Sequence, residues 1–240
     1  MSINDNLVLI SGESGTGKSA SLMNLKEPEK VMYLNCEAGK KLPFKNKFKS
    51  FTITDPLQVY EAFDHAETSN DFNTIVIDTI TFLMDMYESI YVIPSTNTQQ
   101  AWGQYAQFFK NLMQNKVAKS TKNVLFLGHT RAELDEKAMM YRTSVPIKGS
   151  LKNNGVESYF STVVSTKKVT LKDLENYRSN LLNITPQDEL LGYKHVFQTQ
   201  LTKNTIGERI RSPMGMFTTE QTFMDNDCQI LLDHLHEYYN

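Results

Sequence analysis

One short stretch, Gly12-Glu13-Ser14-Gly15-Thr16-Gly17-Lys18-Ser19, limits what this chain can fold into more than any other feature. It has the spacing G-x-x-x-x-G-K-[ST] and follows the apolar run Leu7-Val8-Leu9-Ile10. Glycines let successive backbone N–H groups point inward, and the resulting concavity carries positive partial charge. A strand, a glycine loop and a helix beginning near Lys18 are the context in which this pattern binds phosphate. An ordinary glycine turn before a helix is the alternative.

The loop therefore predicts a nucleoside triphosphate site. The lysine at its end can reach the β- and γ-phosphates, and the next hydroxyl is placed for Mg²⁺. The N-terminal dipole of the expected helix would strengthen the same anion site. The predicted nucleotide-binding residues run without a gap through Gly12, Glu13, Ser14, Gly15, Thr16, Gly17, Lys18, Ser19 and Ala20.

The composition indicates a soluble globular protein of one domain spanning residues 1–240. Hydrophobic residues make up 40% of the chain and charged residues 22%. No apolar run approaches the ~20 residues of a membrane span. Residues 1–6 lack the basic-then-apolar layout of a signal peptide. The two cysteines, Cys36 and Cys228, form neither a disulfide framework nor a zinc pattern, so we expect a reducing cytoplasm.

Strands and helices alternate along the first half of the chain. We expect strands at residues 31–36, 51–53, 74–78 and 123–128, and helices at residues 55–68, 79–91 and 99–119. This alternation is typical of a mainly parallel sheet with right-handed crossovers. Residues 155–217 read as antiparallel strands added at the sheet edge, with an insertion at 171–191. The last element is a C-terminal helix within residues 225–240.

Three polar tips of these strands are candidates for chemistry. Asp78 ends the aliphatic run Ile75-Val76-Ile77, which is the layout of a Walker B strand whose carboxylate holds Mg²⁺. Glu37 follows the second strand and could deprotonate an attacking water. His129-Thr130 ends a later strand and could sense the γ-phosphate. The alternatives are a helix-capping Asp, a solvated turn Glu and a structural His.

Charge is uneven along the chain although the formal net charge is only −2. Residues 141–211 hold 11 Lys/Arg against 6 Asp/Glu, and the tail after them holds 5 acids and no Lys/Arg. The basic part favours a polyanion partner, and unevenly charged solvated faces are the alternative. Trp102, Tyr105, Phe108 and Phe109 could stack bases, but at helical spacing we expect them in the core.

Taken together, these motifs resemble the RecA-like P-loop ATPases, in particular small phage-encoded ATP-binding proteins, some of which are single-strand annealing recombinases. The resemblance covers most of residues 7–217 and implies a RecA-like α/β fold, ATP and Mg²⁺ as cofactors, and assembly into an oligomer. It gives Glu37 the role of catalytic base, and it gives Asp78 and Ser19 the role of metal ligands.

The same resemblance extends to the basic part of the chain. Related hexameric helicases of the DnaB type place a Lys and an Arg on a late hairpin as fingers for the neighbouring subunit. Lys203 and Arg209 are the nearest matches, with Arg211 close by. Residues 146–155 occupy the place of DNA-binding loops, which makes Lys148 and Lys152 candidates for contact with single-stranded DNA.

Three classes of function remain open from the sequence. The first is an ATP-hydrolysing protein that binds single-stranded DNA in phage recombination or replication. The second is a small-molecule P-loop kinase, although an Arg-rich lid is missing, since residues 131–160 hold only Arg131 and Arg142. The third is a nucleotide-dependent assembly switch without DNA binding, against which Glu37 argues.

Overall fold

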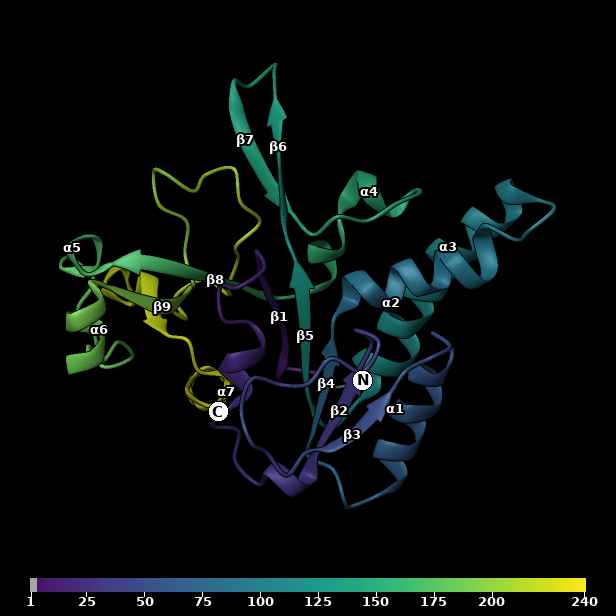
Figure 1. Ribbon diagram of the computed structural model, residues 1–240, viewed down its shortest axis with the longest axis horizontal. Helices are drawn as coiled ribbons and strands as arrows, with labels where there is room; N and C mark the ends of the chain where they lie inside the picture. Colours follow the sequence, from purple (N-terminus) through teal and green to yellow (C-terminus); the bar gives the residue numbers. More distant parts are fainter. Residues whose placement is uncertain (1–3) are drawn as a thin grey trace.

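The computed structural model describes residues 4–240 and has an α/β architecture with helices on both faces of a central sheet (Figure 1). Residues 1–3, part of the segment assessed for a signal peptide, lie outside the described residues. The sheet has the strand order β10-β9-β8-β1-β5-β4-β2-β3. Its strands are β1 (Leu7–Gly12), β2 (Val31–Asn35), β3 (Lys49–Thr52), β4 (Thr74–Asp78), β5 (Asn123–His129), β8 (Thr162–Thr170), β9 (Tyr193–Gln198) and β10 (Phe223–Asp225).

The centre of this sheet is parallel, as predicted. Strand β1 pairs in parallel with β5, β5 with β4, β4 with β2, and β2 with β3. These strands read as almost unbroken aliphatic runs because both of their faces are covered. Alternate side chains pack to opposite sides, so that Leu9 joins one buried cluster while Val8 and Ile10 join the other.

Long helices cover one face of the sheet, and the C-terminal helix covers the other. The first face carries α1 (Gln58–Thr68), α2 (Ile80–Tyr87) and α3 (Thr98–Asn111), followed by short 3-10 and π segments at η3 (Glu88–Val92), η4 (Leu112–Lys116) and η5 (Val117–Lys119). Tyr105, Phe108 and Phe109 of α3 are buried there, which confirms the core interpretation of this aromatic stripe. The opposite face is closed by α7 (Cys228–Tyr239), which confirms the predicted C-terminal helix.

The helix after the glycine loop is much shorter than expected. Only a four-residue 3-10 turn, η1 (Ser19–Leu22), follows Lys18, and a second one, η2 (Pro28–Lys30), precedes β2. The hydroxyl of Ser21 donates to the carbonyl of Lys18 at 2.5 Å, which offers that carbonyl a partner other than a helical N–H. The expected contribution of a helix dipole at the phosphate site was therefore wrong, and the backbone N–H groups of the loop remain as donors.

The second half of the chain differs from prediction in two places. Residues 131–144, whose mixed and weakly periodic sequence predicts no element, form a protruding antiparallel hairpin of β6 (Arg131–Asp135) and β7 (Met140–Ser144) (Figure 1). Strand β8 is not an antiparallel addition at the edge, because it pairs in parallel with β1 and only its outer side is antiparallel, to β9. The remaining short helices are α4 (Leu151–Asn154), η6 (Val156–Tyr159), α5 (Leu171–Leu174), α6 (Pro186–Leu191) and η7 (Thr219–Thr222).

Across residues 4–240 no helix combines the length and the apolar character needed to cross a membrane. Cys36 and Cys228 are both buried free thiols, and burial raises the pKa of each.

Candidate nucleotide-binding site

The strand register brings the predicted polar tips together at the carboxyl edge of the sheet. Gly12 at the end of β1 is level with His129 of β5, and Asp78 of β4 is level with Asn35 of β2. Strand β5 separates the loop strand from the Asp78 strand. Because the ends of parallel strands meet at one edge, residues far apart in sequence converge on a single crevice.

Two glycines of the loop are required by close approach of other groups. A Cβ on Gly12 would lie 2.1 Å from Thr166 Oγ1 and 3.0 Å from the Thr166 carbonyl oxygen. Gly17 has a φ of +108°, and a Cβ there would lie 2.7 Å from Asn226 Nδ2. The loop is thus held between strand β8 and the end of β10, and its shape depends on both positions having no side chain.

Lys18 lies inside the loop rather than in solvent. Its side chain is 6% exposed, and Nζ donates to the carbonyl oxygens of Gly12 at 2.9 Å and Glu13 at 2.7 Å. Burial lowers the pKa of Lys18 to about 8, opposed in part by the charges of Asp78 and Glu37. A phosphate chain in the loop would give this ammonium the anionic partner that its buried position lacks.

Asp78 and Ser19 meet as predicted for a magnesium pair. Ser19 Oγ donates to Asp78 Oδ2 at 3.1 Å, and Tyr33 donates to the same oxygen at 2.6 Å. Burial raises the pKa of Asp78, and its Oδ1 is buried with no hydrogen-bond partner among the described residues. The alternative of Asp78 as a helix cap was wrong, since Thr79 caps α2.

This donor set fits Mg²⁺. A hard cation takes oxygen ligands and is commonly held by one carboxylate, one hydroxyl and substrate phosphates rather than by a full protein cage. The open oxygen of Asp78 and the Ser19 hydroxyl supply the protein ligands. Within the described residues there is also no cluster of three His, Cys, Asp or Glu side chains that would suit another metal.

Glu37 is held on two sides in a nearly buried position, which excludes the alternative of a solvated turn residue. Its Oε1 lies 3.0 Å from His129 Nε2, and its Oε2 accepts from Lys40 Nζ at 2.9 Å. The Glu37 side chain is only 9% exposed. Burial alone would raise the pKa of this carboxyl, but the hydrogen bonds from Lys40 and His129 hold it below its ordinary value.

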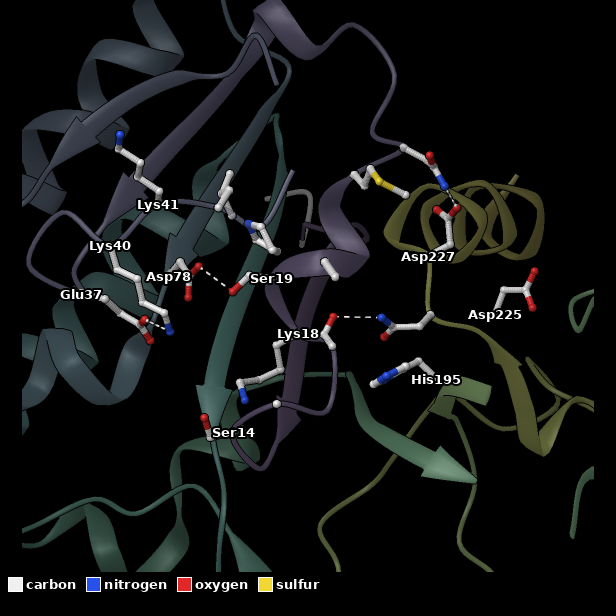
Figure 2. A pocket seen from close by; sticks show the side chains of 18 of the residues that line it. Ser14, Lys18, Ser19, Glu37, Lys40, Lys41, Asp78, His195, Asp225 and Asp227 are labelled. Atoms are coloured by element: carbon white, nitrogen blue, oxygen red, sulfur yellow. Dashed lines mark hydrogen bonds and ion pairs between the residues drawn. The ribbon is translucent and has the colours of Figure 1, made fainter. Parts of the chain in front are cut away.

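These groups line one cavity of about 750 Å³ (Figure 2). Lys18, Ser19, Asp78 and Glu37 lie around the loop, and Figure 2 shows His195, Asp225 and Asp227 on the opposite side of it. The volume is in the range of pockets that hold small ligands and cofactors. Its lining includes Ser14, Gly15, Gly17, Lys18, Ser19 and Ala20 of the predicted loop, whereas Gly12, Glu13 and Thr16 do not line it.

Several lining residues were not predicted from the sequence. Asn226 Nδ2 donates to the Gly17 carbonyl at 2.9 Å, and its Oδ1 is buried without a partner among the described residues. His195 Nδ1 lies 2.8 Å from the Thr16 carbonyl oxygen, and Lys194 pairs with Asp188 and Asp225. Only their position at the ends of β9 and β10 could have identified these residues, because polar residues there face the same crevice.

Of the predicted sensor and finger residues, some line the nucleotide cavity and others do not. His129 lines the cavity, whereas Thr130 does not and instead donates its backbone N–H to Gly12 at 3.1 Å. Lys203, Arg209 and Arg211 are exposed and lie outside this cavity. A role for any of the three at a nucleotide bound in this cavity would therefore require a neighbouring copy.

Lys148 and Lys152 line a second cavity of about 540 Å³, together with Arg131 and Arg209. Lys148 pairs with Glu88 at 2.5 Å, and Lys152 lies 3.9 Å from Glu133. Arg209 Nη1 donates to the carbonyl of Asn154 at 2.9 Å and to Glu157 at 3.2 Å. The structure thus brings the predicted DNA-contacting lysines and one predicted finger to the same place.

Comparison with protein families agrees with this geometry. A family model described as an AAA domain matches residues 4–207. The chain belongs to this AAA domain family. The family is one of P-loop ATPase domains that bind nucleotide, and the mostly parallel sheet fits it. The matched residues end before Arg209 and before helix α7. A search of curated proteins found no match.

Proposed function

We propose that this AAA domain hydrolyses ATP to ADP and phosphate with Mg²⁺. The observation that carries the proposal is the convergence of Lys18, Ser19, Asp78 and Glu37 on one cavity at the carboxyl edge of the sheet. These are the parts that phosphoryl transfer to water requires: a cation and backbone donors for the phosphates, metal ligands, and a base for the water.

Each residue has a defined task in this scheme. The N–H groups of the loop and the Lys18 ammonium bind the β- and γ-phosphates, while Ser19 and Asp78 would hold the metal, which neutralises phosphate charge when bound. Glu37 accepts a proton from the water as the water oxygen bonds to the γ-phosphorus. The bond from that phosphorus to the ADP oxygen breaks, and ADP leaves with the electron pair.

Phosphate release by wild type and Lys18→Ala tests this directly. The variant loses the buried cation and should show no turnover above background. Lys26→Ala is a matched control, because Lys26 is 68% exposed and pairs with Asp233 on the surface. Full activity in Lys18→Ala would count against the site, as would absence of hydrolysis in wild type.

We further infer that single-stranded DNA binds at the second cavity, as expected of a RecA-like protein of phage recombination or replication. Four cationic side chains, from Arg131, Lys148, Lys152 and Arg209, line it against two carboxylates. The cavity is close to the nucleotide site in the chain, because Arg131 begins β6 two residues after His129. A change at His129 would therefore be passed to the hairpin through a very short connection.

The salt dependence of binding tests this inference. Lys148 and Lys152 are 55% and 69% exposed, so both can exchange their carboxylate partners for DNA phosphates. Changing both to Ala should weaken binding of a labelled single strand and reduce the logarithmic salt slope by about 1–2. Lys45 and Lys47, changed together, provide a control of equal charge. An unchanged slope in the Lys148/Lys152 variant would contradict the DNA site.

A further inference from the structure

Lys40 lies at the catalytic end of the nucleotide cavity, although the sequence shows it only as the first of five lysines in residues 40–49. It lines the cavity, and its Nζ is 2.9 Å from Glu37 Oε2. Lys41 lines the cavity as well, but in Figure 2 the Lys40 side chain extends toward Glu37, whereas the Lys41 side chain points the other way. The other three lysines of this run do not line the cavity.

A buried amide builds the turn that places Lys40 there. Asn35 is 5% exposed, and its Oδ1 accepts from the Glu37 N–H at 2.9 Å while its Nδ2 donates to the Lys40 carbonyl at 2.8 Å. Between them Ala38 and Gly39 have φ values of +50° and +79°. A non-glycine residue in the left-handed region costs of order 1 kcal/mol, so this turn is held by its surroundings.

Lys40 lines the same cavity as Lys18 and Asp78, the residues that would hold the phosphates and the metal. Burial is the main reason that the pKa of Lys18 is lowered, and the Lys40 charge acts in the same direction. Burial raises the pKa of Asp78, and the Lys40 charge opposes it. The Lys40 side chain is also 66% exposed, which leaves it free to move from Glu37 to another anion nearby.

We propose that Lys40 is a catalytic cation supplied by the same chain as the bound nucleotide. When ATP binds, the Lys40 ammonium moves from Glu37 to the γ-phosphate oxygens and stabilises the negative charge that they carry in the transition state. The same movement frees Glu37 Oε2 to take the proton of the attacking water. The inference rests on the proposed ATP hydrolysis.

This role differs from that of a trans finger. Lys203, Arg209 and Arg211 lie outside the cavity and need a neighbour, whereas Lys40 is already in place. A cation from the same chain would give a basal rate that does not depend on assembly. A finger from a second copy would add to that rate.

Steady-state hydrolysis of ATP by three variants is the first test. Lys40→Gln should lower kcat by about 10²-fold, the effect of removing one preorganised charge donor. Lys40→Arg keeps the cation and should retain more activity than Lys40→Gln. Lys47→Gln removes the same charge from the same loop outside the cavity and should match wild type. An unchanged kcat in Lys40→Gln would overturn the proposal.

Affinity for ATP and ADP separates a cation on the γ-phosphate from a residue that only positions Glu37. In a Glu37→Gln background, adding Lys40→Gln should weaken binding of ATP with Mg²⁺ by about 10-fold and leave ADP unchanged, because only ATP has the third phosphate. If the ratio of the two dissociation constants stays constant, Lys40 merely holds Glu37 and the proposal is wrong.

A mixture of Lys40→Gln with Lys18→Ala tests whether the cation acts within one chain. No activity should return at any ratio, because the intact Lys40 of the second variant faces an inactive loop. Recovery would show that Lys40 acts on a neighbour and would overturn the assignment to the same chain. A wild type without phosphate release would instead defeat the proposed function itself, so the two failures are distinguishable.

Discussion

At the scale of single residues, the surroundings of Asp78 leave one of its carboxylate oxygens open for a ligand. Tyr33 and Ser19 both donate to Oδ2, and Oδ1 is left without a partner among the described residues. A buried polar atom without a partner costs roughly 1–3 kcal/mol. A ligand that binds Oδ1 would offset this cost, which is why we expect one at this oxygen.

Replacing Asp78 by Asn should therefore weaken the dependence on Mg²⁺. The amide keeps the shape but loses the negative charge, so the Mg²⁺ concentration at half-maximal ATPase should rise by at least about 10-fold. Asp71→Asn is the control, since the Asp71 side chain is 70% exposed and, among residues 4–240, forms an ion pair only with Lys49. A Mg²⁺ titration that matches wild type would remove Asp78 from the metal shell.

Replacing Glu37 by Gln separates binding from chemistry. Glutamine can still accept hydrogen bonds at its carbonyl oxygen but cannot take a proton from water, so turnover should fall by about 10²–10⁴-fold. Nucleotide affinity, measured by titration calorimetry with ADP, should stay within a few fold of wild type. Turnover equal to wild type would reduce Glu37 to a structural partner of His129 and Lys40.

At the scale of elements, the strands of the parallel sheet could be predicted and several connections could not. Apolar runs such as Ile75-Val76-Ile77 are visible in the sequence because both faces of the sheet are buried. The hairpin of residues 131–144 was missed because its strands are exposed on both sides and show no alternation. The 3-10 turn at Ser19–Leu22 depends on the hydrogen bond from Ser21 to Lys18, which no periodicity reveals.

In the candidate site, too, some residues could be predicted from the sequence and others could not. The loop, Asp78 and Glu37 could be found because motif spacing and strand ends identify them. Lys40 and Asn226 could not, since their roles depend on a turn held by Asn35 and on the contact between the end of β10 and Gly17. The contact of Asn226 with Gly17 joins residues far apart in the sequence, whereas Asn35 and Lys40 are five residues apart and form a turn that no hydrophobic period reveals.

The packing of the glycine loop against β8 gives a prediction for stability. Gly12→Ala should lower the free energy of unfolding by about 1–3 kcal/mol, because its Cβ would lie 2.1 Å from Thr166 Oγ1 and 3.0 Å from the Thr166 carbonyl oxygen. Gly103→Ala is the matched control, since that glycine is inside α3 with nothing within 4 Å of a new Cβ. Urea denaturation should show the control slightly stabilised, by up to about 1 kcal/mol. Equal stability of the two variants would contradict the packing argument.

At the scale of the whole molecule, the C-terminal helix contacts the segment that directly follows the nucleotide loop. Asn24 donates to Asp227 at 2.6 Å, and Ser21 Oγ lies 3.1 Å from Cys228 Sγ. The acidic tail that stood out in the charge distribution therefore packs beside the site. Such contacts would transmit a change at the loop to α7.

The finger residues also belong to this scale, because they would act only between copies. Arg209 is held by Glu157, whose side chain is 4% exposed, so its loss would leave a buried charge without its partner and lower the stability. Arg211 is exposed, and within residues 4–240 its side chain has neither an ion pair nor a hydrogen bond. Of the two arginines, Arg211 is thus the one free to reach a neighbouring nucleotide.

Mixing one variant that keeps only the basal rate with one that has no activity tests that role. Arg211→Ala keeps its own site and should retain only the basal rate, whereas Lys18→Ala should have none. In an equal mixture roughly a quarter of the assembled rate should return, because half of the subunits keep Lys18 and half of their neighbours keep Arg211. The recovery should vanish on dilution, when subunits separate. Arg178→Ala, an exposed arginine outside the nucleotide cavity, should behave as wild type. If the mixture stays at the basal rate at every ratio and concentration, no Arg211 reaches a neighbour, and hydrolysis depends on the cations of one chain alone.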